Sequence, residues 1–265
     1  MDNSINMQNI LICEDSIEGI FTAVYEAYSL VSHHKTTHNC IKISAGDICN
    51  YELFSEYIDI KTDYDKAAKV TKTICDKMGF EVYETLLYAS TCEDSDKADA
   101  IYKTIYEGLR LKNGFKILHL WSNDYVTKVL ELYRKARNEF GRWREFLEFR
   151  ELNNGILYSK VGPVCNIISL LAPHFENRLP NENFMIHDDI RDLFLVHEAR
   201  HKCVLVPGDS FMSDRKILES FSDNDLLMCE LFNEFTHTIA IKERVNHKLQ
   251  QQLMPLRIQK YKVEF

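Results

Sequence analysis

Three features are missing from this sequence of 265 residues, and each absence excludes a class of protein. No stretch approaches the roughly 18 uncharged apolar residues that a membrane-spanning helix needs. The opening segment, MDNSINMQNILICED, has neither the basic flank nor the small-residue cleavage site of a secretory signal. No glycine-rich loop is present to hold phosphates, so nucleotide hydrolysis by that route is not expected. The sequence therefore predicts a cytoplasmic protein.

Paired cysteines are also missing, because none of the eight cysteines forms a CxxC motif with another. A chain of this length buries roughly 70 to 75 per cent of its unfolded surface, so its core does not depend on disulfides. We expect reduced thiols that pack as small hydrophobic side chains. A cysteine nucleophile with a histidine partner stays open, because such partners need not be close in sequence.

Positive charge is scarce overall, with 32 Lys and Arg against 40 Asp and Glu and a net charge of −8. This surplus of acidic residues opposes non-specific binding to nucleic acids, which needs clustered cations. Residues 241–260 are the exception, and we name them the basic strip. The strip contains one acidic residue, Glu243, and the basic residues Lys242, Arg244, Lys248, Arg257 and Lys260.

Residues 1–140 predict strands followed by helices. Apolar or alternating runs at 9–13, 40–46 and 56–62 predict three strands, and Asp15 or Ser16 is placed to cap the helix after the first of them. From about residue 64 the apolar spacing is helical, which predicts an all-helical block up to residue 140.

Residues 141–265 predict a sheet region followed by a long helix. FLEFREL and ILYSKV are expected to form a hairpin around the turn signal Asn153-Asn154-Gly155. FMIHDD and LFLVHEARHKCVLV add further strands, while Pro173 is placed in the first turn of a helix. Ser222 and Asp225 are placed to cap a final helix. The apolar stripe of this final helix consists of Met228, Leu231, Phe232, Phe235 and Ile239.

Together these patterns predict an α+β fold with a mixed or antiparallel sheet, a central helical block and a long C-terminal helix. The two regions, 1–140 and 141–265, form either two domains or one continuous domain. We expect the C-terminal region to carry the functional site.

Residues 197–201, HEARH, match the HExxH pattern of zinc enzymes, in which two histidines on one helical turn hold the metal. The flanking runs LFLV and CVLV are strand-like, so we expect a polar loop between two strands. His33, His34, His38 and Cys40 form a second cluster, whose spacing matches no common zinc pattern. We expect neither a bound metal nor another cofactor.

His174 and Arg178 are four residues apart in the helix expected after Pro173, so they share one face. They form the candidate catalytic pair, as a phosphate clamp or as an acid with an orienting cation. The alternative is a capping or strand-bonding role for His174 and a solvated Arg178. His187 and Asp188 are neighbours on an expected strand and point to opposite faces, which favours a structural role for each.

The candidate nucleic-acid-binding residues lie at the two ends of the C-terminal region. They are Arg142, Arg144, Arg244, Asn246, Lys248, Gln251 and Arg257. Arg244 and Lys248 are expected on one helical face with Gln251 one turn on, a combination that binds phosphates and reads base edges. The alternative is a solvated helix end, where cations oppose the helix dipole. Trp143, between two arginines, either stacks on an exposed base or belongs to the core.

Segments in both regions carry a family resemblance. They are ICEDSIEGIFTAVYEAYS, FLEFRELNNGILYSKVGP, the LAPHF block with Arg178 and Pro180, FMIHD, and the ERxNxKLQ pattern with Pro255 and Arg257. Together they resemble a bacterial family of DNA metabolism and DNA repair proteins, defined by a domain of unknown function that also occurs fused to uracil-DNA-glycosylase-like domains. The resemblance implies full-length membership, a role near damaged or modified DNA, and partnership with a radical-SAM protein similar to spore photoproduct lyase. It implies no particular reaction.

Three functions compete on this basis. The first is a DNA-repair protein that presents His174, Arg178, Arg244 and Lys248 to DNA in one basic cleft. The second is an interaction protein that docks on the radical-SAM enzyme through its acidic N-terminal region. The third, and least favoured, is a zinc hydrolase that uses HEARH. Whether the protein is an enzyme stays open.

Overall fold

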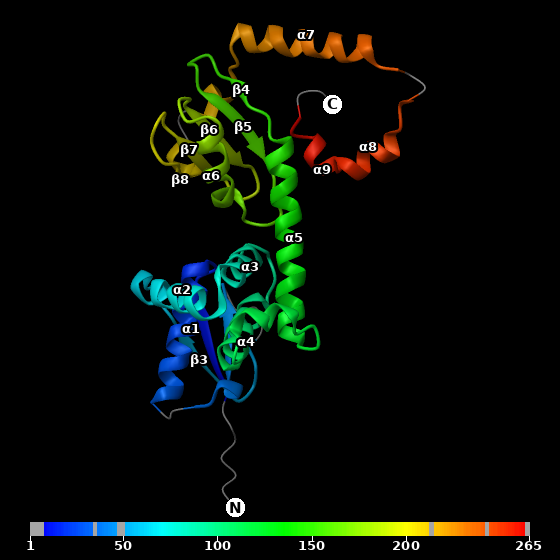
Figure 1. Ribbon diagram of the computed structural model, residues 1–265. Helices are drawn as coiled ribbons and strands as arrows, with labels where there is room; N and C mark the ends of the chain where they lie inside the picture. The colour runs from blue at the N-terminus through cyan, green and yellow to red at the C-terminus, as the bar shows by residue number, and fades with distance from the viewer. Residues whose placement is uncertain (1–7, 34–35, 47–50, 212–214, 242–243, 263–265) are drawn as a thin grey trace, which may run out of the picture. The chain divides into compact units, whose positions relative to one another are not determined.

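The computed structural model describes residues 8–33, 36–46, 51–211, 215–241 and 244–262. The chain divides into two compact units, unit 1 with residues 1–137 and unit 2 with residues 138–265. Helix α5 (Asp124–Phe146) continues across the boundary between them (Figure 1). The α+β class predicted from the sequence is confirmed, because a three-stranded sheet and a five-stranded sheet accompany the helices.

Unit 1 contains a parallel sheet with the strand order β2-β1-β3. Its strands are β1 (Gln8–Cys13), β2 (Ile41–Ala45) and β3 (Ser55–Asp59), which confirms the three predicted strands. Helix α1 (Ile17–Ser32) follows β1 and supplies the crossover that a parallel neighbour requires. Ser16 caps this helix as predicted, since its hydroxyl accepts a hydrogen bond from the Gly19 amide at 3.0 Å.

The predicted helical block of unit 1 is also confirmed. It consists of α2 (Tyr64–Met78), α3 (Phe80–Ser90), α4 (Lys97–Arg110), the 3-10 helix η2 (Gly114–His119) and the first part of α5. Gly79 separates α2 from α3 with a φ of 91°, a conformation that favours glycine. Lys97 is buried, and its ammonium group pairs with Asp15 at 2.5 Å and donates to the Cys92 carbonyl at 2.6 Å. The buried charge is therefore compensated.

The histidine cluster before β2 is partly held by aromatic packing. His38 opens the 3-10 helix η1 (His38–Cys40), its Nδ1 lies 2.6 Å from the Tyr102 hydroxyl, and its ring packs against Tyr28 and Tyr106. Burial, with a smaller contribution from the charge of Lys103, lowers the pKa of His38. His38 is therefore a neutral packing residue at neutral pH. His34 lies outside the described residues.

Unit 2 contains a mixed sheet with the order β4-β5-β6-β7-β8. The strands are β4 (Arg150–Glu151), β5 (Leu157–Val161), β6 (Phe184–Asp188), β7 (Leu193–His197) and β8 (Val204–Pro207). β5 and β6 are parallel and joined through α6 (Ile168–Arg178), while the other neighbours are antiparallel. The predicted β4–β5 hairpin is confirmed, with Gly155 at a φ of 79° in its turn. It is shorter than expected because α5 continues to Phe146.

Two predictions about the helices of unit 2 are wrong. Pro173 does not lie in the first turn of α6, because the helix begins five residues earlier at Ile168 and contains Pro173 in its interior. The terminal helix is not continuous either. It is replaced by α7 (Asp223–Ile239), α8 (His247–Leu253) and α9 (Leu256–Gln259). The predicted Ser222 cap of α7 is confirmed, since its hydroxyl accepts from the Asp225 amide at 3.1 Å.

The two faces of the unit 2 sheet differ in what covers them. On one face, Phe184 packs against Phe175 of α6 and against Phe149. On the other face, Tyr158, Met185, Phe194 and Leu152 form a buried cluster. Leu218 and Phe221, in the segment between β8 and α7 that includes the 3-10 helices η3 (Gly208–Phe211) and η4 (Arg215–Glu219), pack against this cluster. This covering segment leaves part of the second face open as a recess.

Within the described ranges, none of the helices is both long enough and apolar enough to cross a lipid bilayer.

Candidate functional site

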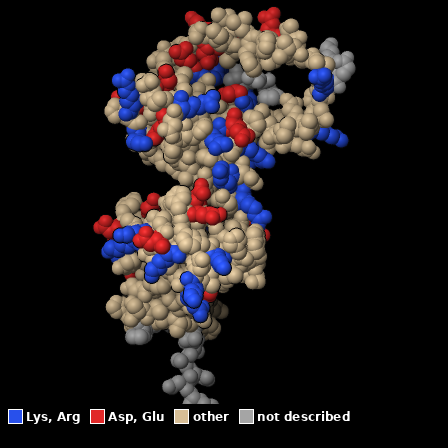
Figure 2. All heavy atoms as spheres, viewed as in Figure 1, with Lys and Arg blue, Asp and Glu red and all other residues tan. Residues whose placement is uncertain are grey.

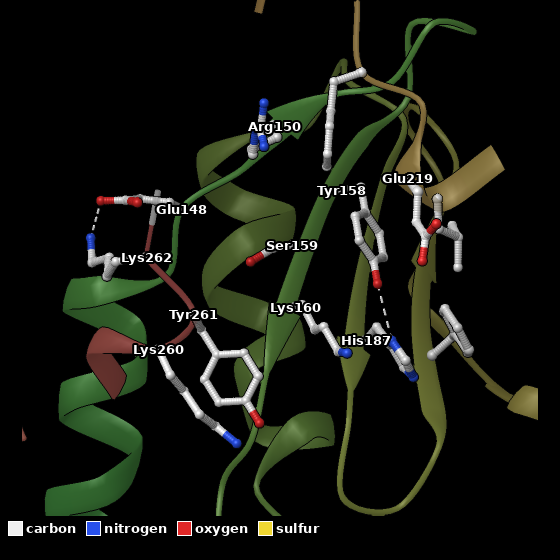
Figure 3. Close-up of a pocket in the computed structure, with 13 residues that line it drawn as sticks. Glu148, Arg150, Tyr158, Ser159, Lys160, His187, Glu219, Lys260, Tyr261 and Lys262 are labelled. Carbon is white, nitrogen blue, oxygen red and sulfur yellow. Dashed lines mark hydrogen bonds and ion pairs between the residues drawn. The ribbon is translucent and has the colours of Figure 1, made fainter. Parts of the chain in front are cut away.

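The recess on the second face of the unit 2 sheet has a volume of about 590 Å³. It lies within unit 2 and is shown in Figure 3. Its basic and acidic lining residues are Arg150, Lys160, Lys260, Lys262, Glu148 and Glu219, and its other lining residues are Tyr158, Ser159, His187, Phe194, Leu218, Phe221 and Tyr261. The lining thus contains more basic than acidic side chains, and it includes several aromatic rings.

Strand pairing brings the central side chains of the recess together. Arg150 lies opposite Tyr158 in the β4–β5 hairpin, and Lys160 lies opposite His187 in the β5–β6 pair. Phe194 on β7 lies opposite His187 in turn. Because side chains alternate along a strand and paired residues share a face, these residues project from the same side of the sheet. Figure 3 shows Tyr158, Lys160 and His187 converging there.

Tyr158, His187 and Asp192 form a hydrogen-bonded chain, of which Tyr158 and His187 line the recess. The Tyr158 hydroxyl lies 3.0 Å from Nδ1 of His187, and Nε2 of His187 lies 3.1 Å from Oδ1 of Asp192. A carboxylate accepts, so Nε2 carries the proton and Nδ1 is left to accept from Tyr158. Burial lowers the pKa of His187, although the hydrogen bond to Asp192 opposes this effect. His187 is therefore a neutral base at neutral pH.

The surroundings hold His187 and Asp192 in place. The ring of Phe194 stacks on His187 with centroids 4.1 Å apart and planes 3° from parallel. Asp192 lies in the turn between β6 and β7 with a φ of 52°, a left-handed conformation that Asp adopts more readily than most residues with a side chain. Gly208 donates its amide to the Asp192 carbonyl at 2.7 Å, and a side chain on Gly208 would overlap the Asp192 carboxylate. Residue 208 must therefore stay small.

Carboxylates position the basic side chains of the recess. Arg150 donates twice to one oxygen of Asp225, at 2.9 and 2.7 Å, and stacks on Phe221 with its guanidinium 3.5 Å from the ring centre. Lys160 pairs with Asp189 at 2.7 Å. Two further cations come from the C-terminal segment. Lys262 pairs with Glu148, and Lys260 lies 4.4 Å above the Tyr261 ring.

The predicted catalytic pair lies outside this recess. His174 is half-buried on α6 beside Phe175, with ring centroids 4.9 Å apart, and Arg178 is the exposed last residue of the same helix. Burial lowers the pKa of His174, and the nearby charges of Arg144 and Arg178 add to the effect. The fold therefore brings Arg144, His174 and Arg178 into one neighbourhood. Their catalytic and nucleic-acid-binding roles stay predictions.

Of the two alternatives for Trp143, the core position is correct and stacking on an exposed base is not. Trp143 is 1% exposed and packs edge-on against Tyr261 with ring centroids 5.6 Å apart. Of its two neighbours, Arg142 is half-buried and Arg144 lies 5.9 Å from the centre of the Phe140 ring. No base can stack on a ring that is already enclosed.

The expected helical face of Arg244 and Lys248 does not exist. Asn246 caps α8, because its side chain accepts from the Leu249 amide at 3.0 Å, and Arg244 lies before the cap. Arg244, Asn246, Lys248 and Gln251 are all exposed, and Lys242 of the basic strip lies outside the described residues. None of the four lines the recess, so binding of nucleic acid by them stays a prediction.

Arg257 has a structural partner that the sequence did not indicate. Its guanidinium pairs at 2.8 Å with Glu139, a carboxylate that is 3% exposed. Glu139 also accepts from the amides of Val164 and Cys165, at 3.0 and 2.8 Å. The pair connects α9 to α5 within unit 2, which places Lys260 and Tyr261 at the recess.

The prediction of a polar loop at HEARH is confirmed. His197 ends β7, stacks on Phe184, and has its Nδ1 2.9 Å from the Glu182 carbonyl. Arg200 has a φ of 68°, which is incompatible with the helix that a zinc motif requires. Among the residues that the structure describes, no three His, Cys, Asp or Glu side chains are arranged to hold a metal ion.

Sequence reasoning missed Tyr158, Lys160, Asp192 and Tyr261 as site residues. The alternation of Tyr158 and Lys160 along β5 was a usable signal, because residues two apart on a strand share a face. Asp192 carried no such signal, since its role depends on its distance to His187.

A comparison with family models places most of the chain in one family. The model of DUF4130, a domain of unknown function, matches residues 95–264. The match includes α4, α5 and the described part of unit 2, whereas the opening segment that resembled the family lies outside it. None of the curated proteins matches the chain.

Proposed function

Because this chain belongs to the DUF4130 family, whose domain has no known function, we propose a function from the recess itself. Unit 2 binds one unpaired nucleotide of DNA, within a single strand or displaced from a duplex. The observation that carries this proposal is the combination of basic and aromatic side chains around a single recess of about 590 Å³.

The size and charge of the recess favour one nucleotide over a duplex surface. Small-molecule sites in proteins typically have volumes of about 300 to 1,000 Å³, and a nucleotide belongs to this size class. The chain as a whole carries a net charge of −8, which disfavours an extended track of phosphates. A local contact to one or two phosphates needs only the cations at the recess.

The lining supplies both kinds of contact that a nucleotide needs. Lys160, Lys260 and Arg150 can bind a phosphate, and Tyr261 turns its ring toward the recess (Figure 3). Aromatic rings bind unpaired bases with little sequence preference. The resemblance to DNA metabolism and repair proteins supports DNA as the source of the nucleotide.

Binding is tested with Lys160→Ala combined with Lys260→Ala. We expect this variant to bind a fluorescent single-stranded oligonucleotide about tenfold more weakly, a loss of about 1.4 kcal/mol. The dependence of log affinity on log salt should become shallower by about 1.4, because each lost phosphate contact contributes about 0.7 on a single strand. Fluorescence anisotropy at several salt concentrations measures both quantities.

The matched control is Lys116→Ala combined with Lys135→Ala, which removes two exposed lysines from unit 1. Equal losses in the two double variants would show that net charge, and not the recess, determines binding. A third double variant, Arg244→Ala with Lys248→Ala, tests whether the basic strip contributes to oligonucleotide binding, as the sequence predicts.

A second candidate function is docking on a radical-SAM enzyme, and the exposed apolar surface of α7 favours it. Met228, Leu231, Phe235 and Ile239 recur at helical spacing and are each at least half exposed, at 56, 50, 57 and 58%. Figure 2 shows that most of the α7 surface in view is uncharged. Clustered apolar residues of this kind mark protein interaction sites.

Docking is tested by co-expression with a tagged radical-SAM protein of the type that the resemblance implies. We expect Leu231→Glu combined with Phe235→Glu to remove most of the co-purified chain, because charges would be buried in an apolar interface. Leu249→Glu with Leu253→Glu on α8 is the control, since these leucines are also exposed. If the α8 variant reduces the amount of co-purified chain as much as the α7 variant does, α7 is not the docking surface.

A further inference from the structure

We propose that Tyr158 is the nucleophile of a phosphoryl-transfer reaction on DNA, with His187 as its general base and Asp192 as the residue that orients His187. This inference rests on the proposed binding of an unpaired nucleotide in the recess, and it adds a reaction to that function. The product is DNA joined covalently to the protein through a phosphotyrosine.

The geometry has the three parts that nucleophilic catalysis requires. A nucleophile must lie within hydrogen-bond reach of a base, and a third group must orient the base. Tyr158 is 3.0 Å from His187, which is 3.1 Å from Asp192. The carboxylate fixes the tautomer in which Nδ1 accepts the phenol proton. The stacked Phe194 ring, 4.1 Å away, prevents rotation out of this plane.

The hydrogen-bonded chain borders the recess, with Tyr158 and His187 themselves buried at 8 and 7% exposed. Tyr158 and His187 both line the recess, and Lys160 lies in register beside His187 (Figure 3). Arg150 lies opposite Tyr158 on the neighbouring strand β4. Cations near the attacked phosphorus stabilise the charge that develops on its oxygens in the transition state.

The reaction balances without any further reagent. The Tyr158 oxygen attacks phosphorus as its proton passes to Nδ1 of His187, and a new oxygen–phosphorus bond forms. The bond between phosphorus and one deoxyribose oxygen breaks, and the departing oxygen takes the proton back from His187. The strand is cut, one part is attached to Tyr158 and the other carries a free hydroxyl. Attack by that hydroxyl reverses the step, while attack by water releases the DNA.

Two features of Asp192 favour a functional arrangement over ordinary packing of a buried pair. The hydrogen bond from Tyr158 occupies only one ring nitrogen of His187, and the other nitrogen needs an acceptor. Here the chain continues to Asp192, which keeps a φ of 52°, and Gly208 leaves the space that its carboxylate occupies. A side chain on residue 208 would displace this carboxylate, so the hydrogen-bonded chain depends on Gly208.

The experiment uses the full chain and a pool of single-stranded oligonucleotides of random sequence that carry different dyes at the two ends. After mixing, detergent stops the reaction, and a denaturing gel separates protein-bound dye. We expect a labelled protein band whose colour reports which strand end is attached. Mass spectrometry of its peptides should locate the nucleotide on Tyr158.

Two variants test the proposed roles of Tyr158 and His187. Tyr158→Phe should abolish the labelled band at an oligonucleotide concentration that anisotropy shows to saturate the variant. His187→Ala should slow band formation roughly 10²- to 10⁴-fold, the usual contribution of a general base, and added imidazole should restore part of the rate. A purely structural histidine would not respond to imidazole. Unfolding curves followed by the fluorescence of buried Trp143 show whether each variant is folded.

Two outcomes overturn the proposal. One is a folded chain that binds the oligonucleotides but forms no labelled band, and the other is a band that persists in Tyr158→Phe. A chain that does not bind the oligonucleotides at all overturns the proposed function instead, so the two failures are distinguishable.

Discussion

The substitution Glu139→Ala is expected to lower the free energy of unfolding of unit 2 by about 2 to 6 kcal/mol, at about 1 to 3 kcal/mol for each of two amides left without an acceptor. Glu139 is 3% exposed and accepts from the amides of Val164 and Cys165 while it pairs with Arg257. Alanine would leave two amides and a guanidinium without their shared acceptor. Removing this acceptor costs more than its hydrogen bonds contribute, because the two amides stay desolvated, whereas the Arg257 side chain is 37% exposed.

The measurement is urea unfolding followed by tryptophan fluorescence. The chain has two tryptophans, Trp121 in unit 1 and Trp143 in unit 2. In a Trp121→Phe background the buried Trp143 therefore reports on unit 2 alone. The control is Glu145→Ala, an exposed carboxylate on the same helix, which should change stability by less than about 0.5 kcal/mol. Equal effects at both positions would contradict the structural role of Glu139.

The ion pair between Glu139 and Arg257 also helps to position residues of the recess. Arg257 belongs to α9, and Lys260 and Tyr261 follow directly after this helix. Ile258 is fully buried and anchors the same helix. The position of two recess residues thus depends on an ion pair between buried Glu139 and half-buried Arg257, which gives Arg257 a structural role that the sequence did not indicate.

The substitution Phe194→Ala is expected to lower the free energy of unfolding of unit 2 by a similar amount, about 3 to 5 kcal/mol. Phe194 is fully buried, belongs to the cluster with Tyr158 and Met185, and stacks on His187. Alanine would leave a cavity in the middle of the sheet face, and the neighbouring strands could close it only in part.

The matched variant for this prediction is Phe194→Leu, measured by the same Trp143 fluorescence. Leucine keeps most of the buried volume, so the loss should stay below about 1.5 kcal/mol. The stack on His187 is lost in both variants. If Phe194→Leu were as damaging as Phe194→Ala, the stabilisation would come from ring stacking and not from filled volume. A folded Phe194→Leu protein also offers a test of whether the stack orients His187 for proton transfer.

Local sequence signals determined much of the secondary structure of this protein. Ser16 and Ser222 cap helices because each hydroxyl reaches an amide only three residues away. The turn at Asn153–Gly155 and the strands around it depend on neighbours within a few positions. The HEARH segment was recognised as a loop from its strand-like flanks. In each case the decisive interaction is short in sequence, so composition and spacing were sufficient.

Predictions were less successful where two local signals in one segment favoured different structures. The run from Arg244 to Gln251 has helical spacing, but the Asn246 side chain captures the Leu249 amide and starts the helix after Arg244. Pro173 is a good residue for a first helical turn, yet buried Ile168 and Leu171 extend α6 ahead of it. Packing of apolar side chains outweighs one lost backbone hydrogen bond.

The sequence by itself determined the α+β class, most of the strands and helices, and the absence of a helix at the HEARH motif. Only the tertiary structure decided which side chains meet at the recess. Tyr158 meets His187 through the pairing of β5 with β6, and Glu139 meets Arg257 across more than a hundred residues of chain. Pairing over such distances depends on how whole surfaces pack, and no pattern within a few residues records it.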